Sequence, residues 1–240
     1  MNNLTTDTFF EGRLRVSQSS SGYRFSIDAV LLAYHVRLRP GDKVLDLGTG
    51  CAIIPLILAY RNPEIAVFGI EIQAGLADVA ALNVRNNAMG DRITILRQDI
   101  AALKPEMIAG PADVVVCNPP YRKPESGRIN PDQERAVARH EIRVSLSDVI
   151  QTVRRVLRTA GRFITIYPAE RITDLLTHMR SAQLEPKFLR IIYSGRHAAA
   201  KLILVEAIKG ARPGARIGAP LIIYDEGGEY TAEVKQMLRP

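Results

Sequence analysis

The sequence predicts an α/β fold in which a mostly parallel, seven-stranded sheet carries helices on both faces. Short apolar segments alternate with longer helical patterns from residue 43 onward, and this alternation is typical of parallel sheets. A hydrophobic fraction of 47% is ordinary for a folded protein. The length of 240 residues fits one domain with small additions.

The elements follow from periodicity and from turn residues. Strands are expected at 43–47, 65–71, 92–97, 113–117 and 161–167, and helices at 52–61, 73–88, 145–158 and 168–182. Ser145 and Asp148 resemble a capping box. Residues 186–194 and 200–208, joined by Ser194-Gly195-Arg196, predict an antiparallel hairpin at the sheet edge. Residues 209–220 are rich in Gly, Pro and Arg and predict an exposed loop.

The chain before residue 43 predicts a small extension. Residues 9–25 alternate around a Ser-Ser-Ser-Gly turn, which favours a hairpin. Ser26 is a candidate N-cap for a helix from about Ile27 to Leu38. We therefore expect one domain over residues 1–240, with an extension at 1–42, a core at 43–208, and a loop and tail at 209–240.

Several classes of protein are disfavoured. The longest apolar stretch, Cys51–Tyr60, is interrupted by Pro55 and is shorter than the roughly 20 residues that span a bilayer. The first residues lack the features of a signal peptide, so we expect a cytoplasmic protein without membrane contact. Two cysteines without a CxxC, and four histidines without ligand spacing, predict that no metal is bound.

The net charge is +7, and the excess is uneven. Residues 122–162 hold ten basic against five acidic residues, and residues 187–216 hold seven against one. A basic balance favours a polyanionic partner such as a nucleic acid, although solvated helix faces would give the same pattern.

A glycine turn follows the first strand of the core. Val44-Leu45-Asp46-Leu47-Gly48-Thr49-Gly50 runs into the helix expected at 52–61. Glycines permit a close backbone approach, and the free N–H groups of a helix N-terminus suit an anion such as a carboxylate or a phosphate. Ile53 stands where the dinucleotide pattern GxGxxG requires glycine, so that fingerprint fails. Asp46 is placed to accept a hydrogen bond from a cationic amino group.

Two further acidic residues follow the next strands. Glu71 can accept hydrogen bonds from both hydroxyls of a ribose, and Asp99 can face an adenine amine. Asp46, Glu71 and Asp99 each lie at the carboxyl end of a predicted strand, where ligands bind in open α/β sheets. The set predicts a site for a nucleoside cofactor.

Asn118-Pro119-Pro120-Tyr121 follows the fourth strand of the core. Consecutive prolines fix the backbone and donate no N–H. The Asn118 side-chain oxygen and the Pro119 carbonyl could therefore accept both N–H bonds of a target amine, and Tyr121 could stack on a planar base or amide. A simple chain reversal would explain the prolines alone, but not their register with the cofactor set.

Asp-Leu-Gly-Thr-Gly with Glu71 resembles the first two motifs of class I, Rossmann-like methyltransferases that use S-adenosylmethionine (SAM), except that Ala52 replaces a third glycine. The Asn-Pro-Pro-Tyr tetrapeptide resembles that of enzymes that methylate adenine N6, cytosine N4 or glutamine N5. The resemblance implies that Asn118, Pro119, Pro120 and Tyr121 are catalytic. It implies that SAM is bound by Asp28, Asp46, Gly48, Thr49, Gly50, Glu71, Ile72, Asp99, Ile100 and Asn118.

Segments outside these motifs extend the resemblance over nearly the whole chain. They are Tyr23–Leu32, Ala138-Arg139-His140-Glu141, Pro220–Tyr224 and Gly228–Thr231. Together they resemble the bacterial family that N6-methylates adenine 37 beside the anticodon of a valine tRNA. A tRNA partner is thus implied, and five residues of the basic segments are candidate RNA contacts: Arg122, Lys123, Arg139, Arg212 and Arg216.

Three alternatives remain. A glutamine methyltransferase acting on release factors would carry a helical domain for which the 43 residues before Val44 leave little room. A DNA adenine methyltransferase usually needs an additional target-recognition region. A SAM- or nucleotide-binding protein without catalysis would be indicated by the loss of Asn118 or Tyr121, and both are present.

Overall fold

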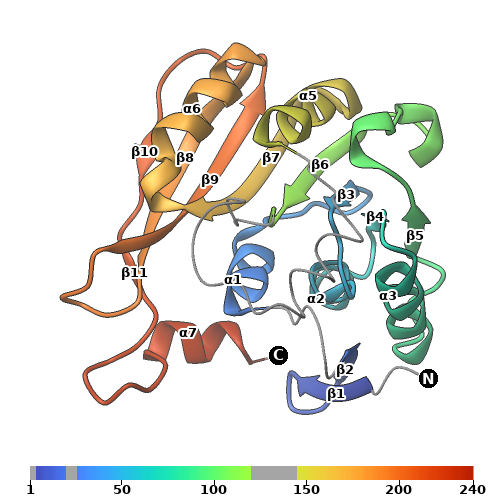
Figure 1. Ribbon diagram of the computed structural model, residues 1–240, viewed down its shortest axis with the longest axis horizontal. Helices are drawn as coiled ribbons and strands as arrows, with labels where there is room; N and C mark the ends of the chain where they lie inside the picture. The colour runs from blue at the N-terminus through green and yellow to red at the C-terminus, as the bar shows by residue number, and fades with distance from the viewer. Residues whose placement is uncertain (1–3, 20–25, 120–144, 240) are drawn as a thin grey trace, which may run out of the picture.

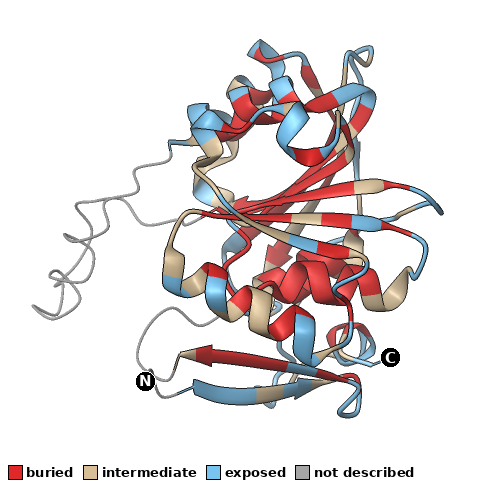
Figure 2. Ribbon diagram, turned by 90° about the vertical axis from the view of Figure 1, so that its right-hand side faces the viewer, coloured by how far each residue is buried: buried red, intermediate tan, exposed pale blue. Residues whose placement is uncertain are grey.

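A computed structural model of the chain describes residues 4–19, 26–119 and 145–239. One nine-stranded sheet runs through the middle, with helices on both faces (Figure 1). Its strands lie in the order β10-β8-β9-β7-β6-β3-β4-β5, and β11 also pairs with β8. A separate two-stranded hairpin lies beyond the helices of one face (Figure 2).

The strands of the large sheet are β3 (Lys43–Leu47), β4 (Ala66–Glu71), β5 (Ile93–Arg97), β6 (Ala112–Cys117), β7 (Leu157–Pro168), β8 (Leu184–Tyr193), β9 (Ala200–Lys209), β10 (Arg216–Ile217) and β11 (Leu221–Ile222). The α-helices are α1 (Ile27–His35), α2 (Ile53–Arg61), α3 (Ala74–Asn86), α5 (Leu146–Val156), α6 (Ile172–Ser181) and α7 (Ala232–Met237). Short 3-10 helices are η1 (Ile100–Ala102), η2 (Pro105–Ile108) and η3 (Ala169–Arg171).

The predicted fold class is confirmed. The seven predicted strands are β3 to β9, and β9 alone among them runs antiparallel, pairing with β7 and β8. Strands that are buried on both faces read as continuous apolar runs. In β6, Val114 and Val116 pack into the core under α1 and α2, whereas Val115 and Cys117 pack into the core under α5 and α6.

The predicted antiparallel β8–β9 hairpin is confirmed, but two short strands lie outside it at the edge of the sheet. Arg216 pairs with Phe188 and Leu221 pairs with Ile192, so β10 and β11 lie outside β8 as two short parallel strands. An uncovered β8 would present a row of unpaired backbone groups. The segment predicted as a loop is mostly exposed, yet it supplies β10, and the chain that follows supplies β11.

An N-terminal hairpin exists, but it is built from an earlier part of the chain than predicted. Its strands are β1 (Leu4–Phe9) and β2 (Leu14–Ser19), and the chain reverses between them at residues 10–13. Most of the predicted Ser-Ser-Ser-Gly turn lies outside the described residues. Phe10, Glu11 and Gly12 all have positive φ angles, of 52°, 57° and 85°. The reversal buries Phe10 and Leu14 on either side of the turn. Residues 20–25 lie outside the described residues.

Helix boundaries agree with the prediction to within a few residues. The capping box is confirmed: Asp148 N–H donates to Ser145 Oγ at 3.1 Å, and Ser145 N–H donates to Asp148 Oδ2 at 2.9 Å. Ser26 occupies the N-cap of α1 but makes no capping hydrogen bond with its side chain, and α1 ends at His35 rather than Leu38. Across residues 4–19, 26–119 and 145–239, no helix is both long and apolar enough to span a membrane.

Candidate functional site

The carboxyl ends of β3, β4 and β6 form one edge of the sheet. Leu47 at the end of β3 pairs with Ile70 on one side and with Cys117 on the other. The next residue along each strand is therefore at the same level: Gly48 after β3, Glu71 at the end of β4 and Asn118 after β6. Neighbouring strands are about 4.8 Å apart. The structure thus brings together the three motifs that are separated in the sequence, as the parallel sheet predicted.

The turn after β3 is held against β4 by backbone hydrogen bonds. The N–H groups of Gly48 and Thr49 both donate to the Ile70 carbonyl at 2.9 Å. Gly48 and Gly50 have φ angles of 75° and 56°, a conformation that costs glycine little. Ala52, which replaces the third glycine, also takes a positive φ, of 68°, at the N-cap of α2.

Asp46 is the most unusual carboxylate of the described chain. It is 0% exposed, and Thr49 Oγ1 donates to its Oδ2 at 2.6 Å. Its Oδ1 is buried and has no hydrogen-bond partner among the described residues. Burial, with a smaller contribution from Glu71, raises the pKa of Asp46 to about 7 against the lowering effect of the Thr49 hydrogen bond. A buried oxygen without a donor is costly, so Oδ1 is suited to receive a donor from a ligand.

Gly69, which belongs to none of the motifs, makes this arrangement possible. A Cβ atom at Gly69 of β4 would stand 2.9 Å from Thr49 Oγ1 and 2.9 Å from Ile95 Cδ1. Glycine at this position lets Thr49 approach the strand closely enough to hold Asp46. The signal in the sequence, a glycine inside a predicted strand, indicates such a close approach.

Glu71 is 6% exposed and both of its oxygens are oriented by backbone donors. Gly50 N–H donates to Oε2 at 3.0 Å, and Gln73 N–H donates to Oε1 at 2.9 Å. A carboxylate has about four acceptor positions, so each oxygen retains capacity for one more donor. Glu71 therefore joins the glycine turn to the end of β4 and still presents acceptors to a ligand.

The other predicted cofactor residues lie around the same edge. Asp99 is half-buried and accepts the Ala101 N–H through Oδ1 at 2.8 Å, which caps η1. Ile72 and Ile100 are half-buried, and the Ile100 carbonyl accepts Thr152 Oγ1 at 3.0 Å. Asp28 lies half-buried in the first turn of α1. Within the described residues, Asp28 makes no hydrogen bond or ion pair with the rest of this set.

The end of β6 is fixed on both sides. Cys117 donates through Sγ to the Leu47 carbonyl at 3.3 Å, and Thr165 Oγ1 donates to the Cys117 carbonyl at 2.8 Å. Asn118 is half-buried and Pro119 is buried directly after this anchor. The structure thus places the first half of the predicted tetrapeptide beside the glycine turn. Pro120 and Tyr121 lie outside the described residues.

Two of the predicted RNA contacts can be located. Arg212 and Arg216 are exposed, and the Arg216 guanidinium lies 5.0 Å from the centre of the Phe188 ring. Because β10 stands four strand positions from β6, Arg216 lies roughly 19 Å to the side of the strand that Asn118 follows. The other three contacts, Arg122, Lys123 and Arg139, fall outside the described residues.

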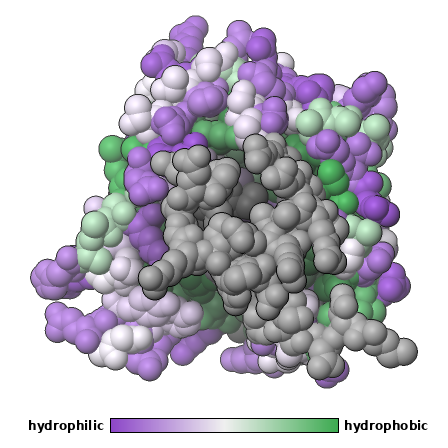
Figure 3. Space-filling view, viewed as in Figure 1, coloured by the Kyte–Doolittle hydropathy of each residue, from purple (hydrophilic) through white to green (hydrophobic). Residues whose placement is uncertain are grey.

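The turn between β8 and β9 is also basic, although none of its residues was among the predicted RNA contacts. The β8–β9 connection carries exposed Arg196, His197 and Lys201. It projects from the left of Figure 1, where Figure 3 shows mostly hydrophilic residues.

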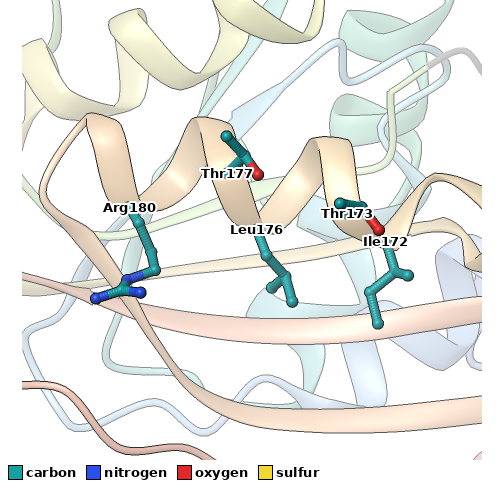
Figure 4. Close-up of a pocket in the computed structure, with 5 residues that line it drawn as sticks. All are labelled: Ile172, Thr173, Leu176, Thr177 and Arg180. Carbon is teal, nitrogen blue, oxygen red and sulfur yellow. The ribbon is translucent and has the colours of Figure 1, made fainter.

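The described residues also contain a surface pocket and two free cysteines. A shallow pocket along α6 is lined by Ile172, Thr173, Leu176, Thr177 and Arg180 (Figure 4) and contains none of the predicted site residues. Cys51 and Cys117 are free and buried, and burial raises the pKa of both thiols. No group of three or more potential metal ligands occurs in the described part of the chain.

Residues 21–170 match the family model described as the methyltransferase small domain. The chain is 31% identical to a tRNA1(Val) (adenine(37)-N6)-methyltransferase of Porphyromonas gingivalis, over 99% of this chain and 95% of that protein. It is 29% identical to the enzyme of the same name from Pedobacter heparinus, over 82% of this chain and 89% of that protein.

Solved structures share the fold. A predicted O-methyltransferase from Agrobacterium tumefaciens superposes with a TM-score of 0.70 at 23% identity, covering 88% of this chain and 94% of that one. A geranyl diphosphate methyltransferase solved in complex with SAM gives a TM-score of 0.54 at 16% identity, covering 75% of this chain and 84% of that one.

Proposed function

This chain belongs to the methyltransferase small domain family, and from that premise we propose that it methylates the exocyclic N6 amine of adenine in tRNA with SAM as donor. The proposed target is adenine 37, beside the anticodon of a valine tRNA, and residues 43–208 form the proposed catalytic core. One observation carries the choice of substrate: the similarity to the tRNA1(Val) (adenine(37)-N6)-methyltransferase of Porphyromonas gingivalis extends over 99% of the chain.

The donor set at the glycine turn fits SAM. Oδ1 of Asp46 is buried and lacks a donor among the described residues, and a cationic ammonium is a donor that favours the ionised carboxylate. The methionine part of SAM carries such an ammonium. Its carboxylate suits the free N–H groups that the helix N-terminus presents after Gly50.

The remaining parts of the cofactor match the neighbouring strand ends. Glu71 would accept hydrogen bonds from the ribose hydroxyls, because its two oxygens are already oriented by Gly50 and Gln73 and still have acceptor capacity. Asp99 would accept a hydrogen bond from the adenine amine through the oxygen that does not cap η1. Ile72 and Ile100 would supply apolar contacts to the adenine ring.

Asn118 and Pro119 would hold the acceptor amine. When bound, SAM supplies an electrophilic methyl group on its sulfonium. The Asn118 side-chain oxygen and the Pro119 carbonyl accept the two N–H bonds of the amine, which turns its lone pair away from the ring and toward the donor. The lone pair of the nitrogen would form the new N–C bond as the bond between the methyl group and the sulfur breaks and the neutral thioether leaves. The nitrogen would then release a proton to solvent, so no strong base is needed. Most of the acceleration then comes from positioning.

An adenine in an anticodon loop is a favourable target for such a site. A base in a single-stranded loop leaves its stack at lower cost than a base in a duplex, where the cost is a few kcal/mol. Tyr121 would stack on the base, and the exposed cations of the β8–β9 turn and of residues 212–216 would contact flanking phosphates.

The experiment supplies SAM with a labelled methyl group to four separate substrates: valine tRNA, ribosomal RNA, duplex DNA and release factor. The expected product is N6-methyladenosine in the tRNA only. A valine tRNA transcript with guanosine at position 37 is the matched substrate control and should remain unlabelled. The Asn118→Ala variant is the matched enzyme control.

The outcomes separate the alternatives. Label in glutamine of release factor, with none in adenosine, would replace the tRNA proposal by a protein methyltransferase. Label in duplex DNA would indicate a DNA adenine methyltransferase. Binding of SAM without transfer to any of the four substrates would leave a cofactor-binding protein without this activity.

A further inference from the structure

The N-terminal hairpin is attached to the core through two asparagine side chains of α3. The edge of β2 that does not pair with β1 faces α3, and no third strand of the described residues completes the ladder there. Asn87 pairs with both backbone groups of Arg15: Arg15 N–H donates to its Oδ1 at 2.9 Å, and its Nδ2 donates to the Arg15 carbonyl at 2.7 Å. Each amide therefore replaces one residue of a missing neighbouring strand.

Asn83 makes the same pair with Ser17, two residues further along β2. Ser17 N–H donates to Asn83 Oδ1, and Asn83 Nδ2 donates to the Ser17 carbonyl, both at 2.8 Å. Residues four apart on a helix are about 6 Å apart along its axis, and residues two apart on a strand span nearly the same distance. Asn83 and Asn87 therefore match the repeat of β2.

The two asparagines differ in their second Nδ2 hydrogen. Asn87 donates it to the Asn83 carbonyl within α3 at 2.8 Å. Asn83 donates it to the Cys51 carbonyl at 2.9 Å. Asn83 is 0% exposed, and all three hydrogen-bonding groups of its side chain are satisfied. A buried amide with every group paired fixes the position of each partner.

The Cys51 carbonyl belongs to the loop that forms the proposed cofactor site. Gly50, the preceding residue, donates its N–H to Glu71, and Ala52, the following residue, holds a positive φ at the N-cap of α2. Fixing the Cys51 carbonyl fixes the peptide plane between Cys51 and Ala52. It thereby restrains the direction in which the loop presents its N–H groups.

We propose that Asn83 is a positioning residue for the SAM loop and that it couples the contact at Ser17 of the N-terminal hairpin to cofactor affinity. The proposal rests on the proposed function for the identity of the cofactor. Because coupling between two sites is reciprocal, ordering of the loop by cofactor also strengthens docking of the hairpin at Ser17. Asn87 docks the same hairpin without contact to the loop and is its natural control.

The test compares Asn83→Ala with Asn87→Ala by hydrogen exchange of single amides and by calorimetric titration with S-adenosylhomocysteine. The Ala52 N–H, which donates to the Thr49 carbonyl at 2.9 Å, reports on the loop without any ligand. We expect Asn87→Ala to accelerate exchange at Arg15 about tenfold and to leave Ala52 and the dissociation constant within about twofold. We expect Asn83→Ala to accelerate exchange at both Ser17 and Ala52.

Asn83→Ala should also raise the dissociation constant for S-adenosylhomocysteine about tenfold. This factor corresponds to roughly 1.4 kcal/mol for one lost hydrogen bond to a buried carbonyl. In turnover, Asn83→Ala should raise the KM for SAM by a similar factor, with kcat within about threefold. Equal effects of the two alanine variants on Ala52 exchange and on affinity would overturn the proposal.

Two further measurements keep the outcome decisive. If Asn83→Ala fails to fold, hydrogen exchange of the unmodified protein is measured with and without S-adenosylhomocysteine. The ligand should slow exchange of the Ser17 amide and leave exchange of the Arg15 amide unchanged. Equal protection of both amides would contradict the coupling. If the protein binds no S-adenosylhomocysteine, the proposed function fails. The positioning role of Asn83 is then still decided by Ala52 exchange in the ligand-free variants.

Discussion

Replacing Asp46 with asparagine should separate the stability of the ligand-free protein from its affinity for cofactor. Burial raises the pKa of Asp46 from 3.8 to about 7. Since the folded state then binds the proton more tightly than the unfolded state, this contribution to stability is fully present below pH 3.8 and is lost as the pH rises through 7. A shift of roughly three pKa units corresponds to about 4 kcal/mol, of which about 3 kcal/mol is lost between pH 5 and pH 8.

Asparagine removes the ionisation but not the burial of a polar group. Its oxygen can still accept the Thr49 hydroxyl, while its NH2 group would take the position of Oδ1, which is buried and makes no hydrogen bond with the described residues. An unsatisfied buried donor costs about 1–3 kcal/mol. At pH 8 the variant should therefore be more stable than the unmodified protein by about 1–3 kcal/mol, and at pH 5 the two should agree to within about 1 kcal/mol.

Affinity for SAM should move in the opposite direction. A hydrogen bond to a charged group contributes about 1.5–3 kcal/mol, so Asp46→Asn should raise the SAM dissociation constant by about ten- to a hundredfold at pH 8. Urea unfolding at pH 5 and pH 8 and calorimetric titration with SAM measure the two effects. Glu64→Gln, which removes an exposed carboxylate, is the control and should change neither.

The reasoning is refuted if the unfolding free energies of the protein and of Asp46→Asn fall equally between pH 5 and pH 8. Equal slopes would show that the carboxylate of Asp46 is not the group whose proton is released. Unchanged SAM affinity in the folded variant would separately contradict its contact with the ammonium.

Glu71→Ala should weaken SAM binding by about 1.5–3 kcal/mol and also lower the free energy of unfolding, because two backbone N–H groups lose their acceptor; calorimetry and urea unfolding would show an effect on neither if the assignment is wrong. Asn118→Ala should lower the single-turnover methylation rate far more than SAM affinity, and a near-normal rate would leave the tetrapeptide as only a turn. Gly69→Ala should force Thr49 away from β4 and reduce both stability and SAM affinity; a crystal structure with an undisplaced turn would contradict this. The logarithm of RNA affinity should fall with the logarithm of salt with a slope of about −3 for four phosphate contacts, and replacing Arg212 and Arg216 together should flatten it by about 1.4 without changing SAM affinity. A slope that the double replacement leaves unchanged would exclude these two arginines from the contact surface.

The sequence alone was sufficient for the main architecture and for the order of residues along the site edge. Strands buried on both faces appear as apolar runs, and their alternation with helices implies parallel pairing. Parallel pairing in turn places every carboxyl end at one edge. Asp46, Glu71 and Asn118 could therefore be grouped before any contact between them was known, because each lies within two residues of the carboxyl end of such a strand.

Local patterns were less informative where several turns were possible. The Ser-Ser-Ser-Gly segment is a plausible turn, but the hairpin reverses at residues 10–13, where burial of Phe10 and Leu14 outweighs the cost of a positive φ at two non-glycine residues. Likewise, residues 216–217 lie in a segment rich in Gly, Pro and Arg, and they form a strand because the outer edge of β8 is available to pair with them.

Only the tertiary structure decided the contacts between polar groups that are far apart in the chain. Asn83 sits inside an ordinary helical pattern, and no neighbour in the sequence indicates that its amide bridges Ser17 and Cys51. The unpaired Oδ1 of Asp46 is equally invisible in the sequence, and a glycine at residue 69 indicates a close approach without identifying Thr49 as the side chain that makes it, because both depend on which atoms surround each position. Periodicity records which face of an element is buried, whereas the partners of a buried polar group are set by the packing of the whole chain.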